Sequence, residues 1–574
     1  MLKDLVIQDV YEAAKKVAPS IELSQIHITP AKQKSHGDYA CSIAMQLAKL
    51  LGKSPMEIAE SIKNNIDASH YASVEVAAPG FINVKFDAEY LKKEALNESY
   101  FSPMKKGNNE TVILEYCSLN VGKPMNIGHL LNTIYGEAMN RLLRWYGYNV
   151  ISDNHIGDWG TQFGKLLVAL KKWGDMEEVK KEPNKKLVEL YIKFHDEADK
   201  DPTLEDLARD TFTALEQGDP ELVKLWEWIV EVNMVENHKI FEKLHVKFDT
   251  EHGEAFYMPI VPKVMDEMLS KGILTKNEDG SIAMNFEEKG INLPSCLMQK
   301  KDGSTLYHTR DVATIDFRLK EYNPKKIVYV VGDEQSLHFR QLFAIAGLLG
   351  WGDGVEFYHM NYGLFTMKEG KMSTRKGRVI YAEEVLDEAE ERALAILNER
   401  GVFADDETAK KKLAKSLGYG AVFYANLSQN RNTSQLFDWD KVLSFEGNSA
   451  PYLQYVYARA ASMLRKAKDD KGVEVETSEV FDIQELQEAE RTLLIKLLQF
   501  NEVIESTTVD YRPNFLAQYL YELCGDFNGF YNELSVLNAE SDVSMKFRLQ
   551  LVARTKDVMK KGLELLDIEA PEKM

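Results

Sequence analysis

Cysteine is scarce in this sequence, which has four in 574 residues. Cys41, Cys117, Cys296 and Cys524 lie far apart, and none forms a pair at the short spacing that zinc sites use. We therefore expect no disulfide framework and no metal site built into the protein. The same scarcity suits a reducing compartment, and we expect the cytoplasm.

Long apolar runs are also lacking, so we expect no segment that crosses a bilayer and no membrane partner. Residues 1–20 mix acidic with apolar residues, which is typical of an amphipathic helix rather than a signal peptide. An excess of basic charge is missing as well, because the formal net charge is -20. That excludes a general nucleic-acid coat protein but allows binding of one folded RNA through local basic patches.

The chain is too long for one hydrophobic core, and its texture changes along its length. Residues 1–100 combine helical stretches with strand-like "YASVEVAA" and "GFINVKF", which indicates a small N-terminal α/β domain. Residues 108–400 repeat strand, loop and helix, as in "TVILEYCS" and "NVISDN", which predicts an α/β catalytic domain with a doubly wound parallel sheet of the Rossmann type. We expect a helical insertion at about 171–250 and an all-α helical bundle at 405–574.

A Gly-His pair, Gly128 and His129, follows a strand and opens a helix in "SLNVGKPMNIGHL". Helix N-termini attract phosphate, and a glycine leaves the backbone open to a flat nucleobase or ribose. The imidazole could donate a hydrogen bond as charge develops on phosphate oxygens. The alternative is that Gly128 is a turn residue and His129 a solvated cap.

A second phosphate-suited stretch is "GKMSTRKGR", residues 370–378, a basic loop flanked by glycine. Such a loop could fold over a triphosphate and neutralise it while pyrophosphate leaves, which is transition-state stabilisation by positioned cations. The alternative is a solvated basic loop. Two such loops in one α/β protein are a more specific signal of a nucleotide phosphate site than either loop alone.

Together these stretches resemble a known family. "NIGH" and "KMSTR" resemble the "HIGH" and "KMSKS" signatures of class I aminoacyl-tRNA synthetases. "LEYCSLNVGKPMNIGHL", "NHIGDWGTQFGKL", "LYHTRDVATI" and "GKMSTRKG" together resemble the arginyl-tRNA synthetases. The resemblance is nearly full length, because "SHGDYACSIAMQLAK" is similar to that family's N-terminal domain and "APYLQYVYARA" to its anticodon-binding domain.

The resemblance implies that ATP, as its Mg2+ complex, activates L-arginine to arginyl-adenylate, and that a terminal ribose hydroxyl of tRNA(Arg) then takes the arginyl group. Members usually need bound tRNA before the first step. The resemblance also implies that the N-terminal domain holds the D-loop of the tRNA and the bundle its anticodon. We expect a monomer.

The resemblance also implies three sets of site residues. The catalytic and ATP-binding set comprises Lys123, Asn126, Gly128, His129, Gly363, Lys371, Met372 and Ser373. The arginine-binding set comprises Glu115, Ser118, Asn120, His155, Asp158, Tyr307, Asp311 and Gln335. The tRNA-binding set comprises Phe81, Asn83 and Arg459.

Residue chemistry supports part of the arginine set. A guanidinium is a planar, permanently charged fork that demands carboxylates in a rigid pocket. Glu115 lies inside an apolar strand, where an acid needs a partner. Tyr307 and Asp311 are spaced to share one helix face, although a surface charge is the alternative for Asp311. For Phe81 the alternative is burial between sheet and helix, and for Arg459 a solvated helix face.

The sequence departs from the family pattern at two positions. Asn126 replaces the first signature histidine, and its amide can still donate but cannot carry charge, so we predict a weakened phosphate contact. Thr374 replaces the second signature lysine, and in this family a lysine at the place of Lys123 is thought to supply that charge. These departures motivate one alternative, a tRNA-binding relative that has lost catalysis. Another nucleotidyltransferase with a Gly-His site would not explain residues 405–574.

Overall fold

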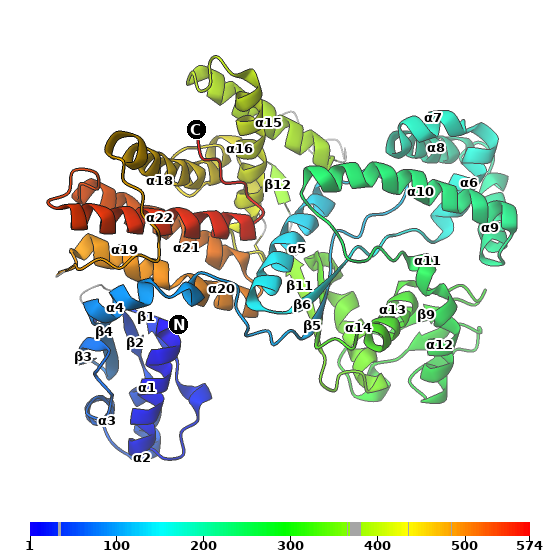
Figure 1. The fold of residues 1–574 in the computed structure, drawn as a ribbon. Coiled ribbons are helices and arrows are strands. Elements are labelled where there is room, and N and C mark those ends of the chain that lie inside the picture. Colours follow the sequence, from blue (N-terminus) through cyan, green and yellow to red (C-terminus); the bar gives the residue numbers. More distant parts are fainter. Residues whose placement is uncertain (32–35, 364, 368–379, 434, 484) are drawn as a thin grey trace. The chain divides into compact units, whose positions relative to one another are not determined.

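The computed structural model describes the whole chain except residues 32–35, 364, 368–379, 434 and 484 (Figure 1). The chain forms two compact units. Unit 1 joins Met1–Met104 with Ser444–Met574, and unit 2 is the continuous segment Lys105–Leu443. Within the described residues, every helix is too short or too polar to serve as a bilayer span.

Unit 2 is built on a parallel four-stranded sheet, which confirms the predicted doubly wound α/β fold. Its strands are β5 (Thr111–Glu115), β6 (Asn149–Asp153), β10 (Lys326–Gly332) and β11 (Glu356–Tyr362), in the order β11-β10-β5-β6. The chain moves from β5 outward to β6 and later returns to β10 on the other side of β5. The order of strands therefore reverses between β5 and β10, and ligands of such sheets bind at the carboxyl ends of strands at this point.

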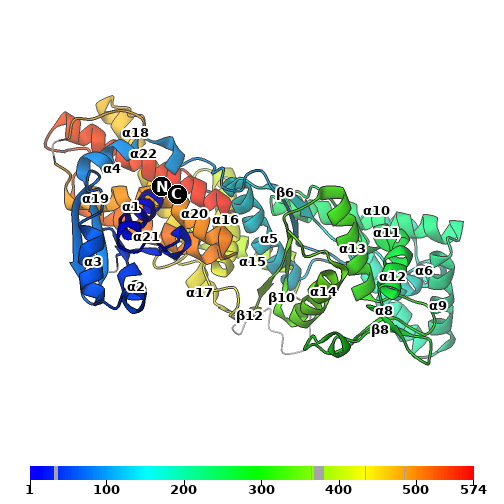
Figure 2. The same cartoon turned by 90° about the horizontal axis from the view of Figure 1, so that it is seen from below.

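Helices cover both faces of this sheet. Helix α5 (Ile127–Tyr146) lies on one face, and α13 (Tyr307–Tyr322) and α14 (Ser336–Leu349) lie on the other (Figures 1 and 2). One core packs Ile327 and Tyr329 of β10 with residues of α13, α14 and α12 (Val261–Ser270).

Five helices follow β6, and they have their own core around Phe163, Phe194 and Ile229. They are α6 (Thr161–Trp173), α7 (Met176–Lys181), α8 (Pro183–Ala198), α9 (Thr203–Glu216) and α10 (Pro220–Lys243). After α11 (Glu254–Tyr257) and α12 comes a small antiparallel sheet that the sequence pattern did not reveal. Its strands are β7 (Thr275–Lys276), β8 (Ile282–Met284) and β9 (Cys296–Gln299).

The rest of unit 2 consists of two short paired strands and three helices. Strand β12 (Phe365–Met367) pairs in parallel with β13 (Gln435–Phe437). The helices are α15 (Ala382–Glu399), α16 (Glu407–Leu427) and α17 (Trp439–Val442). By its contacts α16 belongs to unit 2 and not with the helices that follow residue 444.

Unit 1 combines a four-stranded antiparallel sheet with a helical bundle. The sheet has the order β1-β2-β4-β3. The elements of Met1–Met104 are α1 (Leu2–Val17), β1 (Ile28–Pro30), β2 (Tyr39–Cys41), α2 (Ile43–Leu51), α3 (Pro55–Lys63), β3 (Tyr71–Ala77), β4 (Phe81–Phe86) and α4 (Ala88–Ala95). The bundle comprises α18 (Ala450–Lys471), α19 (Glu488–Leu498), α20 (Phe500–Val509), α21 (Pro513–Glu533) and α22 (Asp542–Leu565).

Buried polar contacts bind these two parts of unit 1 together. Arg491 of α19 donates two hydrogen bonds, of 2.9 and 2.8 Å, to the carboxylate of Asp38. The Tyr39 hydroxyl donates to Glu502 of α20 at 2.8 Å. Burial raises the pKa of Glu502 to about 7, so this contact lies in a dry interface.

The packing of α5 on the sheet depends on Gly136. A Cβ at this position would fall on the ring of Tyr116, which follows β5 directly. Gly136→Ala should therefore destabilise the protein by about 1–3 kcal/mol through overpacking, although alanine normally favours a helix by about 1 kcal/mol over glycine. Thermal unfolding measures the effect. Gly347→Ala in α14, where a Cβ meets nothing within 4 Å, is the matched control and should be neutral or stabilising. Equal effects of both substitutions would contradict this account.

Candidate active site

The two central strands part at their carboxyl ends, and one side chain spans the opening. Glu115 and Tyr329 are the last register partners of β5 and β10. Beyond them, Asn132 of α5 accepts a hydrogen bond from the backbone N–H of Cys117 at 2.7 Å and donates one to the carbonyl of Val330 at 2.5 Å. Asn132 therefore fixes the separation of the two strand ends, and sequence reasoning missed it because its partners are distant in sequence.

The loop after β5 has a constrained backbone. Cys117 and Ser118 adopt left-handed conformations with φ of 72° and 51°, and such strain is concentrated at functional sites. The buried Ser118 hydroxyl has no hydrogen-bond partner among the described residues. Asn120 forms a parallel bridge with Gly157, which holds this loop beside the loop that follows β6. The strand ends thus present Ser118 and Asn120 from a fixed backbone.

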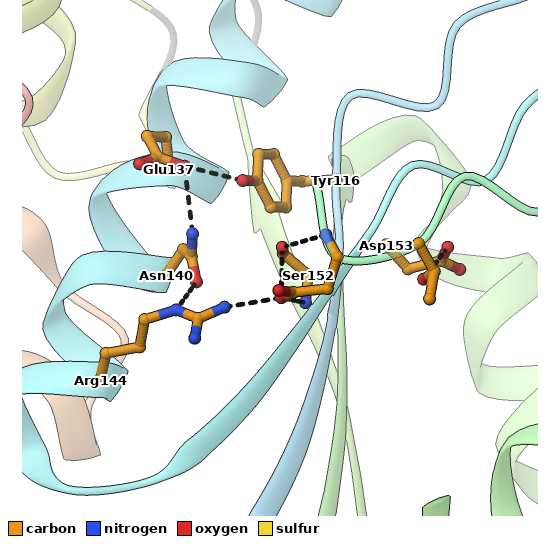
Figure 3. Close-up of polar contacts among 8 residues, drawn as sticks. Tyr116, Glu137, Asn140, Arg144, Ser152 and Asp153 are labelled. Atoms are coloured by element: carbon orange, nitrogen blue, oxygen red, sulfur yellow. Dashed lines mark hydrogen bonds and ion pairs between the residues drawn. The ribbon is translucent and has the colours of Figure 1, made fainter. Parts of the chain in front are cut away.

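A chain of side-chain hydrogen bonds links the end of β5 to α5 and β6 (Figure 3). The Tyr116 hydroxyl donates to Glu137 at 2.7 Å, and Asn140 donates to the same carboxylate at 3.2 Å. Arg144 donates to Asn140 at 2.8 Å and to Asp249 at 2.6 Å. Asp249 in turn accepts from the backbone and the hydroxyl of Ser152 in β6, each at 2.8 Å. β5, α5 and β6 are therefore held in one frame.

Asn126 is the N-cap residue of α5. The resemblance to the family signature did not suggest this structural role. The side-chain oxygen of Asn126 accepts a hydrogen bond from the backbone N–H of His129 at 3.0 Å. The backbone N–H of Asn126 donates to Nδ1 of His129 at 3.3 Å. Asparagine is among the best N-cap residues. Because Nδ1 accepts a hydrogen bond, the proton of the neutral ring lies on Nε2.

The imidazole of His129 is held in its neutral form. Burial, and secondly the positive charge of Lys123, lower the pKa of His129 to about 4. Lys123 is exposed on the loop before α5, and Gly128 beside His129 is exposed as well. The start of α5 therefore offers a neutral N–H donor, and the exposed Lys123 adds a positive charge near it.

The chain that follows the basic loop returns to this same helix start. Residues 368–379 lie outside the described part of the chain. Directly after them, Ile380 accepts the backbone N–H of Ile127 at 2.9 Å, and Tyr381 bridges Asn126 in antiparallel fashion. Residues 380 and 381, which follow the second phosphate-suited stretch in the sequence, are thus joined to the start of α5 by backbone contacts.

Of the four predicted residues in or near the basic loop, only Gly363 is among the described residues. Lys371, Met372 and Ser373 are outside the described residues. Gly363, which precedes the loop, donates its backbone N–H to the carbonyl of Arg431 at 2.7 Å.

Helix α13 carries two of the predicted site residues, Tyr307 and Asp311. Tyr307 is its first residue, 65% exposed, and Asp311 lies one turn further on. Nε2 of His338 lies 2.6 Å from the Asp311 carboxylate. Burial alone would raise the pKa of Asp311, but this hydrogen bond and the charges of nearby histidines lower it below its ordinary value. Asp311 therefore stays ionised near neutral pH.

The loop after β6 forms another wall. His155 packs against Tyr257 with ring centres 5.5 Å apart, and its Nδ1 is buried without a partner among the described residues. The Asp158 carboxylate accepts the backbone N–H of Ala255 at 2.9 Å, and burial raises its pKa. A Cβ at Gly253 would fall on this carboxylate, so the close approach needs glycine. The charges of His155 and Asp158 both act on Glu254, as does that of Asp311, so these groups share one neighbourhood.

Glu115 already has an internal partner, Arg318 of α13. Nη2 of Arg318 lies 2.6 Å from Glu115 and 2.5 Å from Asp153. Ligand atoms of Glu115, Asp153 and His155 lie within 4.8 Å of one another, a spacing that could hold a metal ion. Since the guanidinium of Arg318 already contacts both carboxylates, we assign no ion here. Sequence reasoning required a partner for Glu115 but did not identify one.

The remaining predicted residues lie on other elements. Gln335 is exposed in the short turn after β10. In unit 1, Phe81 is half-buried at the start of β4, and Asn83 is buried in the same strand. Arg459 of α18 is half-buried; its guanidinium donates to Asn528 at 3.0 Å.

Three family models match successive parts of the chain. Residues 92–439 match the catalytic domain of class I tRNA synthetases (R), residues 453–574 the DALR anticodon binding domain, and residues 4–86 the arginyl tRNA synthetase N terminal domain.

Curated proteins and solved structures agree with these matches. The chain is 40% identical to the arginine–tRNA ligase of Fusobacterium nucleatum over 573 residues, 99% of each chain. It is 38% identical to that of Clostridium kluyveri over 98% of this chain and 99% of the other. The arginyl-tRNA synthetase structure from Plasmodium falciparum has a TM-score of 0.85 and 25% identity, covering 100% of this chain and 99% of that one. The Thermus thermophilus structure has a TM-score of 0.84 and 25% identity, covering 100% of both.

The neutral state of His129 can be tested by NMR. With histidine labelled by 15N, the His129 ring should remain neutral from pH 8 down to about 5, with a midpoint near 4. Lys123→Met should raise this midpoint, because it removes the positive charge, but leave it below the ordinary value of about 6.5, because burial is the larger cause. His129→Gln assigns the signal among the 12 histidines. A wild-type midpoint near 6.5 would contradict the described environment.

Proposed function

The chain belongs to the arginyl-tRNA synthetase family of the class I aminoacyl-tRNA synthetases, and on that basis we propose that it ligates L-arginine to tRNA(Arg). It is an enzyme that uses ATP as a substrate. An oxygen of the arginine carboxylate attacks the α-phosphorus of ATP, and pyrophosphate leaves. A terminal ribose hydroxyl of the tRNA then attacks the carbonyl carbon of arginyl-adenylate, and AMP leaves. Mg2+ enters with ATP.

One observation supports this function most strongly: the backbone pairing of Tyr381 with Asn126. It joins a residue that closely follows the "GKMSTRKG" stretch in the sequence to the start of the helix that carries His129. We propose that Nε2–H of His129 donates to the phosphates and that Lys123 supplies the charge that Thr374 lacks. In this proposal Lys371, Met372 and Ser373 complete the site from the loop. Gly128 leaves room for the adenosine, and the amide NH2 of Asn126 can donate while its oxygen caps the helix.

The cap also weakens the case for a relative that has lost catalysis. Asn126, in place of the first signature histidine, was one of the two differences from the family pattern that motivated this alternative. Its role as the cap of α5 explains why an asparagine stands at this position. Nothing in the structure favours a different nucleotidyltransferase.

For the amino acid, we propose that Asp311 and Tyr307 hold the guanidinium. Asp311 is ionised and oriented by His338, so it can form the charge-assisted hydrogen bonds that arginine requires. The loops after β5 and β6 and the turn after β10 would hold the ammonium and carboxylate. The residues of these segments are Ser118, Asn120, His155, Asp158, Gln335 and, at the strand end, Glu115.

For the tRNA, we propose that Phe81 and Asn83 contact the D-loop and Arg459 the anticodon arm. The guanidinium of Arg459 lies over the rings of Tyr455 at 4.9 Å and Tyr531 at 5.5 Å. Both tyrosines are exposed, and planar groups of this kind suit stacking on unpaired bases. We propose that the enzyme acts as a monomer in the cytoplasm.

Aminoacylation of tRNA with each of the standard amino acids tests the function. Arginine should be the one that is attached, and arginine-dependent exchange of pyrophosphate into ATP should need tRNA(Arg). A folded protein that attaches another amino acid, or binds tRNA(Arg) without charging it, would refute the proposal.

The role of Lys123 predicts a separation of chemistry from RNA binding. Lys123→Ala should slow adenylate formation about 100-fold, because it removes a positioned cation from the phosphate site. Binding of tRNA(Arg) should change less than about twofold. Lys224→Ala, at an exposed lysine of α10, is the control and should leave both quantities unchanged. Equal losses in chemistry and tRNA binding would contradict the assignment.

A further inference from the structure

Three neighbouring strands carry a row of aligned side chains, which lies at the carboxyl ends of β5 and β6 and within β10. Asp153 of β6, Glu115 of β5 and Tyr329 of β10 are register partners. Aligned residues of neighbouring strands project from the same face of a sheet. The row therefore places two carboxylates side by side, and both residues are buried, with exposed fractions of 8% for Glu115 and 2% for Asp153.

Two adjacent buried carboxylates repel each other unless a cation compensates them. Arg318 provides that cation, and its own side chain is only 1% exposed. A single nitrogen, Nη2, contacts both acids, and the guanidinium carbon lies 5.5 Å from the ring centre of Tyr329. The row and Arg318 together carry one net negative charge.

Arg318 is also connected to the proposed substrate pocket. It follows Asp311 by seven residues, two helical turns, so both lie on one face of α13 about 10 Å apart along its axis. The charges of Arg318, Glu115 and Asp311 all act on the Tyr329 hydroxyl, which places the row and the pocket next to each other. Nε and Nη1 of Arg318 are buried without a hydrogen-bond partner among the described residues, so its contacts are confined to the two acids on one side.

We propose that Arg318 is a positioning residue for the arginine site, a resident guanidinium that cancels one of the two row charges and fixes the carboxylate of Glu115. This inference rests on the proposed function. Arg318 contacts Glu115 through Oε2. In this proposal Oε1 is the oxygen that remains for the incoming amino acid. Without Arg318, the row would be a doubly charged cation site that competes with Asp311 for the substrate guanidinium.

The experiment compares three variants in the full-length enzyme with tRNA(Arg). Arg318→Met removes the charge but keeps similar length, and it should raise the KM for arginine at least tenfold while the KM for ATP changes less than about threefold. Arg318→Lys keeps the charge and should lie between wild type and Arg318→Met. Combining Arg318→Met with Asp153→Asn restores one net negative charge. The KM for arginine should therefore fall most of the way back to the wild-type value. The new amide oxygen can still accept the hydroxyl of Thr250, which contacts Asp153 at 2.6 Å.

A matched control separates this role from mere packing. Arg548 of α22 is also a buried arginine between two acids, Glu490 and Glu540, in unit 1. Arg548→Met should lower the unfolding temperature without changing the ratio of the two KM values. If a variant is inactive but folded by circular dichroism, calorimetric titration of L-arginine into its complex with tRNA(Arg) gives the same comparison.

Two results would overturn the inference. One is an unchanged KM for arginine in Arg318→Met, and the other is a double variant no better than the single one. Both are distinct from failure of the proposed function, in which the wild-type enzyme would not charge arginine at all.

Discussion

The site depends on the separation of two parallel strands that share one register up to Glu115 and Tyr329. Beyond that pair β5 turns away, whereas β10 continues beside β11 as far as Gly332. Asn132 sets the width of the opening through one backbone donor and one backbone acceptor. A buried amide is suited to this task because each of its two ends must find a partner, and here both partners belong to strand ends.

The two halves of the opening differ in electrostatics. On the α5 side, a capped helix start offers donors and a nearby lysine, which suits a polyanion. On the α13 side, each acid has an internal partner: Asp311 a histidine, Asp158 a backbone amide, and Glu115 an arginine. Despite burial, the nearby histidines lower the pKa of Asp311, whereas burial raises that of Asp158, so in the proposed function Asp311 is the better suited of these two to meet a guanidinium.

Much of this could be predicted from the sequence, and the limit was sequence distance. The alternation of strand and helix indicated the parallel sheet, and the Gly-His pair predicted a phosphate site where α5 begins, because both are local patterns. The partner of Glu115 could not be found, since Arg318 is about 200 residues away and its pairing depends on how α13 lies on the sheet. Asn126 illustrates a different limit. A family signature assigns it to the phosphates, whereas the cap geometry shows that half of its side chain stabilises the helix. The small sheet β7-β8-β9 was missed because strands of two to four residues give no clear periodicity.

The joining of the two chain ends in unit 1 has a consequence for biosynthesis. Residues 1–104 leave the ribosome before unit 2, whereas Arg491 and Glu502, the partners of Asp38 and Tyr39, are made only after all of unit 2. At about 5–20 residues per second, this interval is roughly 20 to 70 s. During that time the nascent N-terminal segment exposes polar groups and surface that its finished form buries. Completion of unit 1 therefore has to wait until all of unit 2 has been translated, and a chain truncated before α19 would leave residues 1–104 without Arg491 and Glu502.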